Sequence, residues 1–258
     1  MGSIFGAVFV TACVSAVPTP EPVPANKPNV VPSPPISPPP IAPVPRTRTS
    51  RGGPWNFTYA PGAYAFTIVT SATVAPMADT NQKRQLPESH QKVTIALSNT
   101  GDLQVVDPAP STTTLCDSSS ALITRAQQIL PKLPSQLTVG YRWRDSTTTT
   151  GCRGTIPAES TVISNYVVVG DTTVMNLPAL EVHRVDSLSA TGEGSDGQHR
   201  ILVNATGTGV VDFFLDTIAG RFISSRGSQT SLVNVTTSGK LTQFIQDVTE
   251  LVNVASSQ

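Results

Sequence analysis

The sequence predicts a mainly β chain of the α+β class, in which a long-stranded antiparallel meander is covered by one helix. Only 13% of the 258 residues are charged, and Thr and Val, which favour strands, are frequent. From residue 63 onward, strand-like runs recur between turn signals, and one segment has clear helical spacing. These observations together favour a sheet of sequential hairpins.

The expected strands are separated by residue pairs that are typical of tight turns. The strand-like runs cover residues 63–74, 92–98, 141–150, 161–170, 179–190, 199–216 and 221–237. Turns are expected at Gly170-Asp171, Ala219-Gly220 and Ser238-Gly239. The segment 241–254 has apolar residues at helical spacing, but it follows a Ser-Gly turn and is rich in β-branched residues. We favour a final strand there, with a helix as the alternative.

One helix is expected over residues 118–130. Asp117 or a following Ser can cap its start, and Pro131 ends it. Its apolar face comprises Leu122, Ile123, Ala126, Ile129 and Leu130. Because a half-buried sheet needs a covering layer, this helix is expected on the inner face of the sheet.

The chain divides into a signal segment at 1–12, a proline-rich tether at 13–54 and a β-rich domain at 55–258. Thirteen of the 23 prolines fall between Pro18 and Pro45. Proline fixes φ and removes a donor, so the tract is expected to form polyproline II, with a reach of up to roughly 90 Å. We interpret it as a spacer in preference to a PxxP ligand for another domain.

The apolar run before the tether has the length of a signal peptide. Residues 4–17 contain no charge, and about fourteen residues are too few for a membrane-spanning helix, which needs roughly 20. They suit the apolar region of a signal peptide, which has about 7–15.

Val10-Thr11-Ala12-Cys13 resembles the bacterial lipobox. The resemblance implies cleavage before Cys13 and acylation of its thiol; the alternative is an ordinary signal peptide with an incidental cysteine. No Lys or Arg precedes the apolar run, which departs from the usual signal pattern and would be explained by a true start upstream of Met1. The resemblance also implies that Val14, which follows the cysteine, favours sorting to the outer membrane, facing the periplasm or the cell surface.

The same interpretation accounts for the odd number of cysteines. If Cys13 carries lipid, Cys116 and Cys152 remain as an even pair, and we expect them to form a disulfide. The loop-entropy model assigns such a bond about 4 kcal/mol. The alternative is two buried free thiols, and a metal site is disfavoured because no CxxC or His pair accompanies them.

Two phrases add a resemblance at the level of the fold. "LTVGYRW" (137–143) and "FLDTIAGRF" (214–222) are similar to phrases in uncharacterised β-rich envelope lipoproteins. Together with the long hairpins, they resemble the lipoprotein-carrier (LolA/LolB-type) superfamily. This resemblance implies a curved half-barrel sheet whose concave face forms a groove for acyl chains.

No motif in the sequence predicts catalysis, a cofactor or a metal. The histidines at positions 90, 183 and 199 have no metal-binding spacing. In a strand, His183 and Val185 would share one face and Arg184 and Asp186 the other, and we interpret this segment as a solvated polar face. "GEGSDG" (192–197) matches a dinucleotide-binding pattern, but a strand-like run follows it, so a hairpin loop is expected.

The sequence therefore predicts a monomeric, non-enzymatic lipoprotein outside the cytoplasm, anchored to a bacterial membrane. The formal net charge of zero gives no basis for a nucleic-acid partner. The expected ligand is a lipid or another apolar small molecule. Two alternatives stay open, an adhesion or scaffold module of the envelope and, less favoured, a secreted hydrolase that uses His183 or His199.

The anchor gives the first testable prediction. A labelled fatty acid should be incorporated into the full chain in bacteria and should not be incorporated into a Cys13→Ala variant. The variant should also leave the membrane fraction. An unlabelled parent chain that fractionates identically to Cys13→Ala would show that the lipobox resemblance is accidental.

Overall fold

A computed structural model describes residues 53–98, 102–107, 128–153, 156–197 and 199–254. Ten of the strands in these ranges form one antiparallel sheet, and two short strands form a separate pair. The strands are β1 (Trp55–Asn56), β2 (Gly62–Pro76), β3 (Arg84–Gln85), β4 (Ser89–Leu97), β5 (Leu103–Asp107), β6 (Gln136–Leu137), β7 (Arg142–Arg153), β8 (Ile156–Val174), β9 (Leu177–Asp196), β10 (His199–Asp216), β11 (Arg221–Thr237) and β12 (Lys240–Val254).

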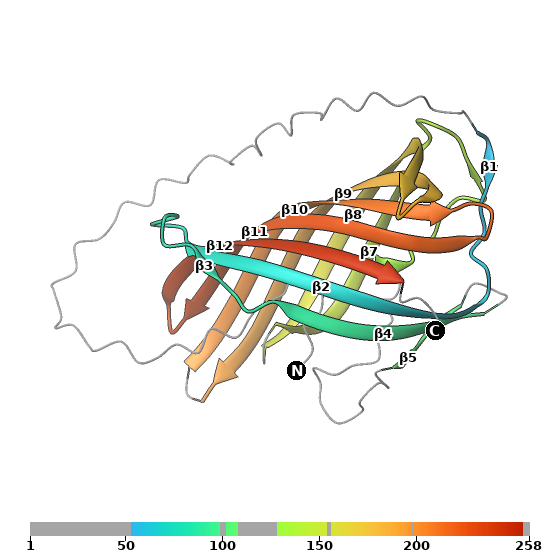
Figure 1. Cartoon of the computed structure of the whole chain (residues 1–258). Helices are drawn as coiled ribbons and strands as arrows, with labels where there is room; N and C mark the ends of the chain where they lie inside the picture. Colours follow the sequence, from blue (N-terminus) through green and yellow to red (C-terminus); the bar gives the residue numbers. More distant parts are fainter. Residues whose placement is uncertain (1–52, 99–101, 108–127, 154–155, 198, 255–258) are drawn as a thin grey trace, which may run out of the picture.

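The predicted meander of long strands is confirmed. From β7 to β12 each strand pairs with the next, and the full order is β5-β4-β2-β12-β11-β10-β9-β8-β7, with β3 on the side of β2. The segment after Ser238-Gly239 is strand β12, as favoured from the sequence. The sheet curls into an antiparallel half-barrel with β5 and β7 as its end strands (Figure 1).

Two of the three expected turns are present, and the third is wrong. Ser238 and Gly239 both have positive φ, as a two-residue hairpin turn requires, and Gly220 has a φ of 62°. Gly170 instead lies inside the continuous strand β8, where the register with β9 shifts between Val168 and Gly170. The turn comes later, at Met175 and Asn176, which both have positive φ.

The expected covering helix is not among the elements of the described residues. Most of the range 118–130 lies outside them; Gln128 and Ile129, at its end, are helical, and an irregular segment follows. That segment does cover the concave face, because Ile129, Leu130 and Leu137 are buried in the main core. The backbone N–H of Phe57 donates to the carbonyl of Ser135 over 3.0 Å, which joins a second covering segment to it.

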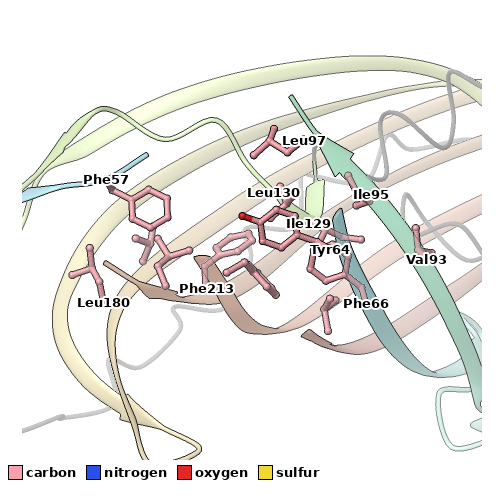
Figure 2. Packing of buried hydrophobic residues seen from close by; sticks show 14 of the residues in the cluster. Phe57, Tyr64, Phe66, Val93, Ile95, Leu97, Ile129, Leu130, Leu180 and Phe213 are labelled. Atoms are coloured by element: carbon pink, nitrogen blue, oxygen red, sulfur yellow. The ribbon is translucent and has the colours of Figure 1, made fainter. Parts of the chain in front are cut away.

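The main core explains why the sheet curls. It contains Ile95 from β4 and Val105 from β5, and also Val168 from β8 and Val182 from β9. These strands lie toward opposite ends of the strand order, so their side chains share one cluster because the sheet bends toward itself. Figure 2 shows how Phe57 and Leu130 enter this cluster beside Phe213 of β10. Burial of this apolar surface favours the curled form by roughly 25 cal/mol for each Å² removed from water.

Glycines on the concave side allow neighbouring strands to coil closely. A Cβ at Gly207 would lie 2.5 Å from the Ser231 Oγ and 2.6 Å from the Thr230 carbonyl oxygen. A Cβ at Gly227 would lie 3.0 Å from a Val211 methyl carbon. Glycine in a strand interior often marks such a close approach. "GEGSDG" belongs to the same pattern, because Gly192 and Gly194 lie within β9 and Gly197 alone has the positive φ of a turn.

Adjacent residues of β2 test the assignment of faces. Ile68 is fully buried in the main core, whereas Val69 points to the convex side. Ile68→Ala should lower the free energy of unfolding by about 2–5 kcal/mol, because it leaves a cavity. Val69→Ala should lower it by about 1 kcal/mol or less. Urea unfolding of both variants measures the difference, and equal effects would mean that the faces of β2 are assigned wrongly.

Candidate functional site

A cavity of about 1030 Å³ lies between the concave face and its covering segments. Strands β8 to β12 form its floor, β7 and the β4–β5 hairpin form its sides, and residues 57–59 and 128–135 cover it. Small-molecule sites in proteins commonly have volumes of ~300–1,000 Å³. This cavity therefore has room for a ligand at the upper end of that range.

One part of the lining is apolar and continues into the main core. It includes Phe57 and Leu130 from the cover, Leu97 from β4 and Val252 from β12. Val211 of β10 is partly buried and packs against the same cluster. A hydrocarbon group in this part of the cavity would therefore contact side chains that are already shielded from water.

The other part of the lining holds a buried ion pair. The Arg184 Nε donates to Asp186 Oδ2 over 3.0 Å, and its Nη2 lies 3.0 Å from the same oxygen. The Ser164 hydroxyl donates to Asp186 Oδ1 over 2.7 Å. The side chains of Arg184 and Asp186 are only 10% and 13% exposed. Both oxygens of the carboxylate are bonded, as a buried charge requires.

Arg184 also connects the sheet to the cover. Its Nη1 donates to the backbone carbonyl of Gln128 over 3.3 Å, and its Cζ lies 5.0 Å from the centroid of the Phe213 ring. The guanidinium group thus holds the start of the covering segment against β9 and β10. Gly209 of β10 and Gly227 of β11 line the cavity nearby. Because neither has a side chain, β10 and β11 approach closely there: a Cβ at Gly209 would lie 3.1 Å from the Ser228 carbonyl oxygen.

Aromatic residues complete this side of the cavity. Tyr166 stacks on Trp143 of β7 with ring centroids 4.7 Å apart and planes 2° from parallel. Burial raises the pKa of the Tyr166 hydroxyl, while Arg184 and Ser164 partly offset that rise. Burial also raises the pKa of the Tyr59 hydroxyl, and nearby Tyr166 adds to the effect. The Tyr59 hydroxyl has no hydrogen-bond partner among the described residues, so a neutral polar group is buried in the wall.

The structure places His183 and Val185 on one face of β9 and Arg184 and Asp186 on the other, as predicted. The interpretation of a solvated polar face is wrong for Arg184 and Asp186, whose side chains are largely buried. Arg184 and Asp186 line the cavity, whereas His183 bonds to Asp212 on the convex face over 2.7 Å. Alternation along β9 assigns the two pairs to opposite faces. It does not reveal which face becomes the inside of a curled sheet, and that is why the sequence missed the ion pair.

The other predicted site residues are not tested by the structure. Cys13 and Cys116 lie outside the described residues, and only the backbone of Cys152 is described, paired with Pro157 in the β7–β8 ladder. The lipid anchor and the disulfide therefore remain predictions. Within the described ranges, no group of three or more His, Cys, Asp or Glu side chains could hold a metal ion. The same ranges contain no helix of sufficient length and apolar character to span a bilayer.

The histidines do not form the arrangement that the hydrolase hypothesis needs. That hypothesis requires His183 or His199 in a concave pocket with a carboxylate and a nucleophile. His199 bonds to the Ser238 hydroxyl over 2.8 Å at a hairpin end, and His90 pairs with Glu88 on the surface. Of the described residues that line the cavity, none is a histidine.

The ion pair gives a prediction on stability. Arg184→Met should lower the free energy of unfolding by about 3–5 kcal/mol, because it leaves Asp186 buried without its partner. Adding Asp186→Leu should recover much of that loss, since a buried ion pair can be replaced by apolar groups at little cost. Urea unfolding of both single variants and of the double variant gives the coupling. Strictly additive losses would contradict a direct interaction.

No protein-family model matches the chain, and no curated protein matches it. A solved structure that is similar in part is "OmpTdeltaL8 (loop L8 deletion mutant of OmpT), an outer membrane protein of Vibrio cholerae". The identity is 9%, with coverage of 75% of this chain and 99% of that one, and the TM-score is 0.13. A score this low carries no argument on fold or function.

Proposed function

We propose that the chain is a lipoprotein outside the cytoplasm, whose half-barrel domain binds an amphipathic lipid or a similar small molecule. The observation that supports this most directly is the cavity of about 1030 Å³ on the concave face. Its volume suits a ligand larger than most metabolites. The cavity lies between the sheet and separate covering segments, so a ligand could be enclosed there while every strand of the sheet keeps its pairing.

The two-part lining favours an amphipathic ligand over a purely apolar one. Phe57, Leu97 and Leu130 offer an apolar wall, and burial of a hydrocarbon chain against it contributes about 0.8 kcal/mol for each CH₂ group. Ser164, Gln229 and the buried Tyr59 hydroxyl offer polar atoms in the same space. The polar groups would orient one end of the ligand, as is usual in largely apolar sites.

The proposed location rests on the sequence. The lipobox resemblance at Cys13 provides an anchor, and the prolines at 18–45 provide a spacer of up to roughly 90 Å. An anchored domain with a cavity for an amphipathic molecule would operate close to the membrane that contains such molecules. We therefore propose the bacterial outer membrane as its location and binding, without catalysis, as its role.

The cavity also bears on the scaffold alternative. A pure adhesion or scaffold module predicts a flat sheet with an exposed edge and no pocket. The observed sheet is curled, and its concave face has an open volume that spans several strands. A role in binding accounts for this volume, whereas a scaffold role does not require a cavity.

Neighbouring residues of β10 offer a matched test of ligand binding. Val211 lines the cavity, and Val210 lies on the opposite face of the same strand. The full chain should be extracted gently from membranes and analysed by native mass spectrometry. The parent and Val210→Trp should carry a bound lipid-sized molecule, and Val211→Trp should lose most of it, because the indole fills the space.

Thermal unfolding should confirm that both tryptophan variants are folded. If the parent carries no adduct and binds no lipid after removal of detergent, the proposed function is wrong. Equal retention by Val211→Trp and Val210→Trp would place any bound molecule outside the cavity.

A further inference from the structure

A second hollow, of about 350 Å³, lies at the β7 edge of the sheet. Trp143 and Tyr166 line it together with six residues that form two cross-strand rows. In these rows Arg142 is paired with Val167 and Val167 with His183, and Arg144 is paired with Asn165 and Asn165 with Val185. These six residues belong to the face opposite the cavity, because Trp143, Tyr166 and Arg184 alternate with them along the same strands. Tyr166 lines both the hollow and the proposed ligand cavity, but the charged and amide side chains of the hollow lie on the opposite face from the cavity.

Its lining combines apolar surface, from Val167, Val185 and two aromatic residues, with two arginines, an asparagine and a histidine. Arg142 and Arg144 stand two positions apart on β7, so both point to the convex face, and both are exposed. Neither forms an ion pair with another described residue, and no described carboxylate lines the hollow. Two guanidinium groups and the Asn165 amide thus bring many N–H donors to one small volume.

His183 is held in a fixed orientation at the same hollow. Its Nδ1 lies 2.7 Å from Asp212 Oδ1, and the Arg226 Nε donates to Asp212 Oδ2 over 3.2 Å. Burial alone would raise the pKa of Asp212, but His183 and Arg226 bring the pKa below its usual value, so the carboxylate stays ionised. Because Nδ1 is engaged, Nε2 is the nitrogen that His183 can offer to a ligand.

We propose that this hollow binds a phosphate group. Arg142 and Arg144 would donate to its oxygens, since the planar fork of arginine matches phosphate geometry. The Asn165 amide would donate to another oxygen, and His183 Nε2 would accept from a protonated oxygen or donate when the ring is charged. A phosphate ester has more acceptor oxygens than a carboxylate and uses this donor set more fully.

Charges on an edge strand also have a simpler explanation, because they discourage pairing with the edge of another sheet. That role requires only charge and not the shape of the guanidinium group. It also gives no reason for a hollow with Asn165 and a fixed His183 beside the two arginines. Replacement of arginine by lysine separates the two explanations, because lysine keeps the charge but loses the fork.

The test uses the full chain with Cys13→Ala, so that an acyl group does not bind vesicles by itself. Inorganic phosphate should be titrated at low ionic strength and followed by the NMR signals of the arginine Nε–H groups. Arg142→Gln/Arg144→Gln should weaken phosphate binding about tenfold or more. Arg142→Lys/Arg144→Lys should weaken it by several-fold. The control Arg84→Gln/Lys92→Gln, which removes the same charge from β3 and β4, should bind like the parent.

Vesicles of phosphatidylcholine with and without phosphatidylglycerol identify the source of the phosphate. Binding to inorganic phosphate alone would indicate a soluble phosphate compound, and added binding to anionic vesicles that depends on both arginines would indicate a lipid headgroup. No binding to either probe, or equal losses in the test and control pairs, would overturn the proposal. The lysine pair binding as tightly as the parent would leave only the edge-protection role. None of these results depends on the lipid cavity.

Discussion

The pairing of β2 with β12 is the constraint on which the rest of the structure depends. It joins the first long strand to the last one, with Ile68 opposite Val252 and Phe66 opposite Val254. Through this ladder β4 and β5 become the continuation of a sheet whose other strands follow in sequence from β7. Without it, Ile95 and Val105 would have no route to Val168 and Val182, and the main core would not form. The cavity, its cover and the curl of the sheet all follow from one long-range contact.

The sequence predicted well what depends on local pattern. Runs rich in β-branched residues between turn signals identified the long strands. The Ser238-Gly239 turn was placed correctly, and both of its residues have the positive φ of a two-residue hairpin. The turn predicted at Gly170 was wrong, because glycine is favoured both in turns and at irregularities inside a strand. The true β8–β9 turn is at Met175 and Asn176; Asn favours positive φ, but Met is unusual there, so the pair is a weak turn signal.

The candidate site could not be predicted from local sequence pattern. Its lining brings Gly209 of β10 and Gly227 of β11 together with the covering residues 57–59 and 128–135, and this combination depends on the register between strands and on the curl of the sheet. The ion pair of Arg184 and Asp186 looks like an ordinary exposed pair in sequence, and only the direction of curl makes it internal. One strand, β9, thus presents a buried ion pair on one face and a histidine held by an aspartate on the other.

The end strands of the half-barrel have a consequence for kinetics. The cavity reaches both of them, with Leu103 of β5 on one side and Thr147 of β7 on the other, and no ladder joins β5 to β7 in the described part of the chain. A ligand that passes between β5 and β7 would break no backbone hydrogen bond between described strands. The residence time of the ligand would be set by side-chain contacts and by the hydrogen bond from Arg184 to the backbone of Gln128, and not by the unfolding rate of the domain. If the domain binds the proposed ligand, the lack of a β5–β7 ladder in the described part of the chain would favour exchange that is fast relative to unfolding.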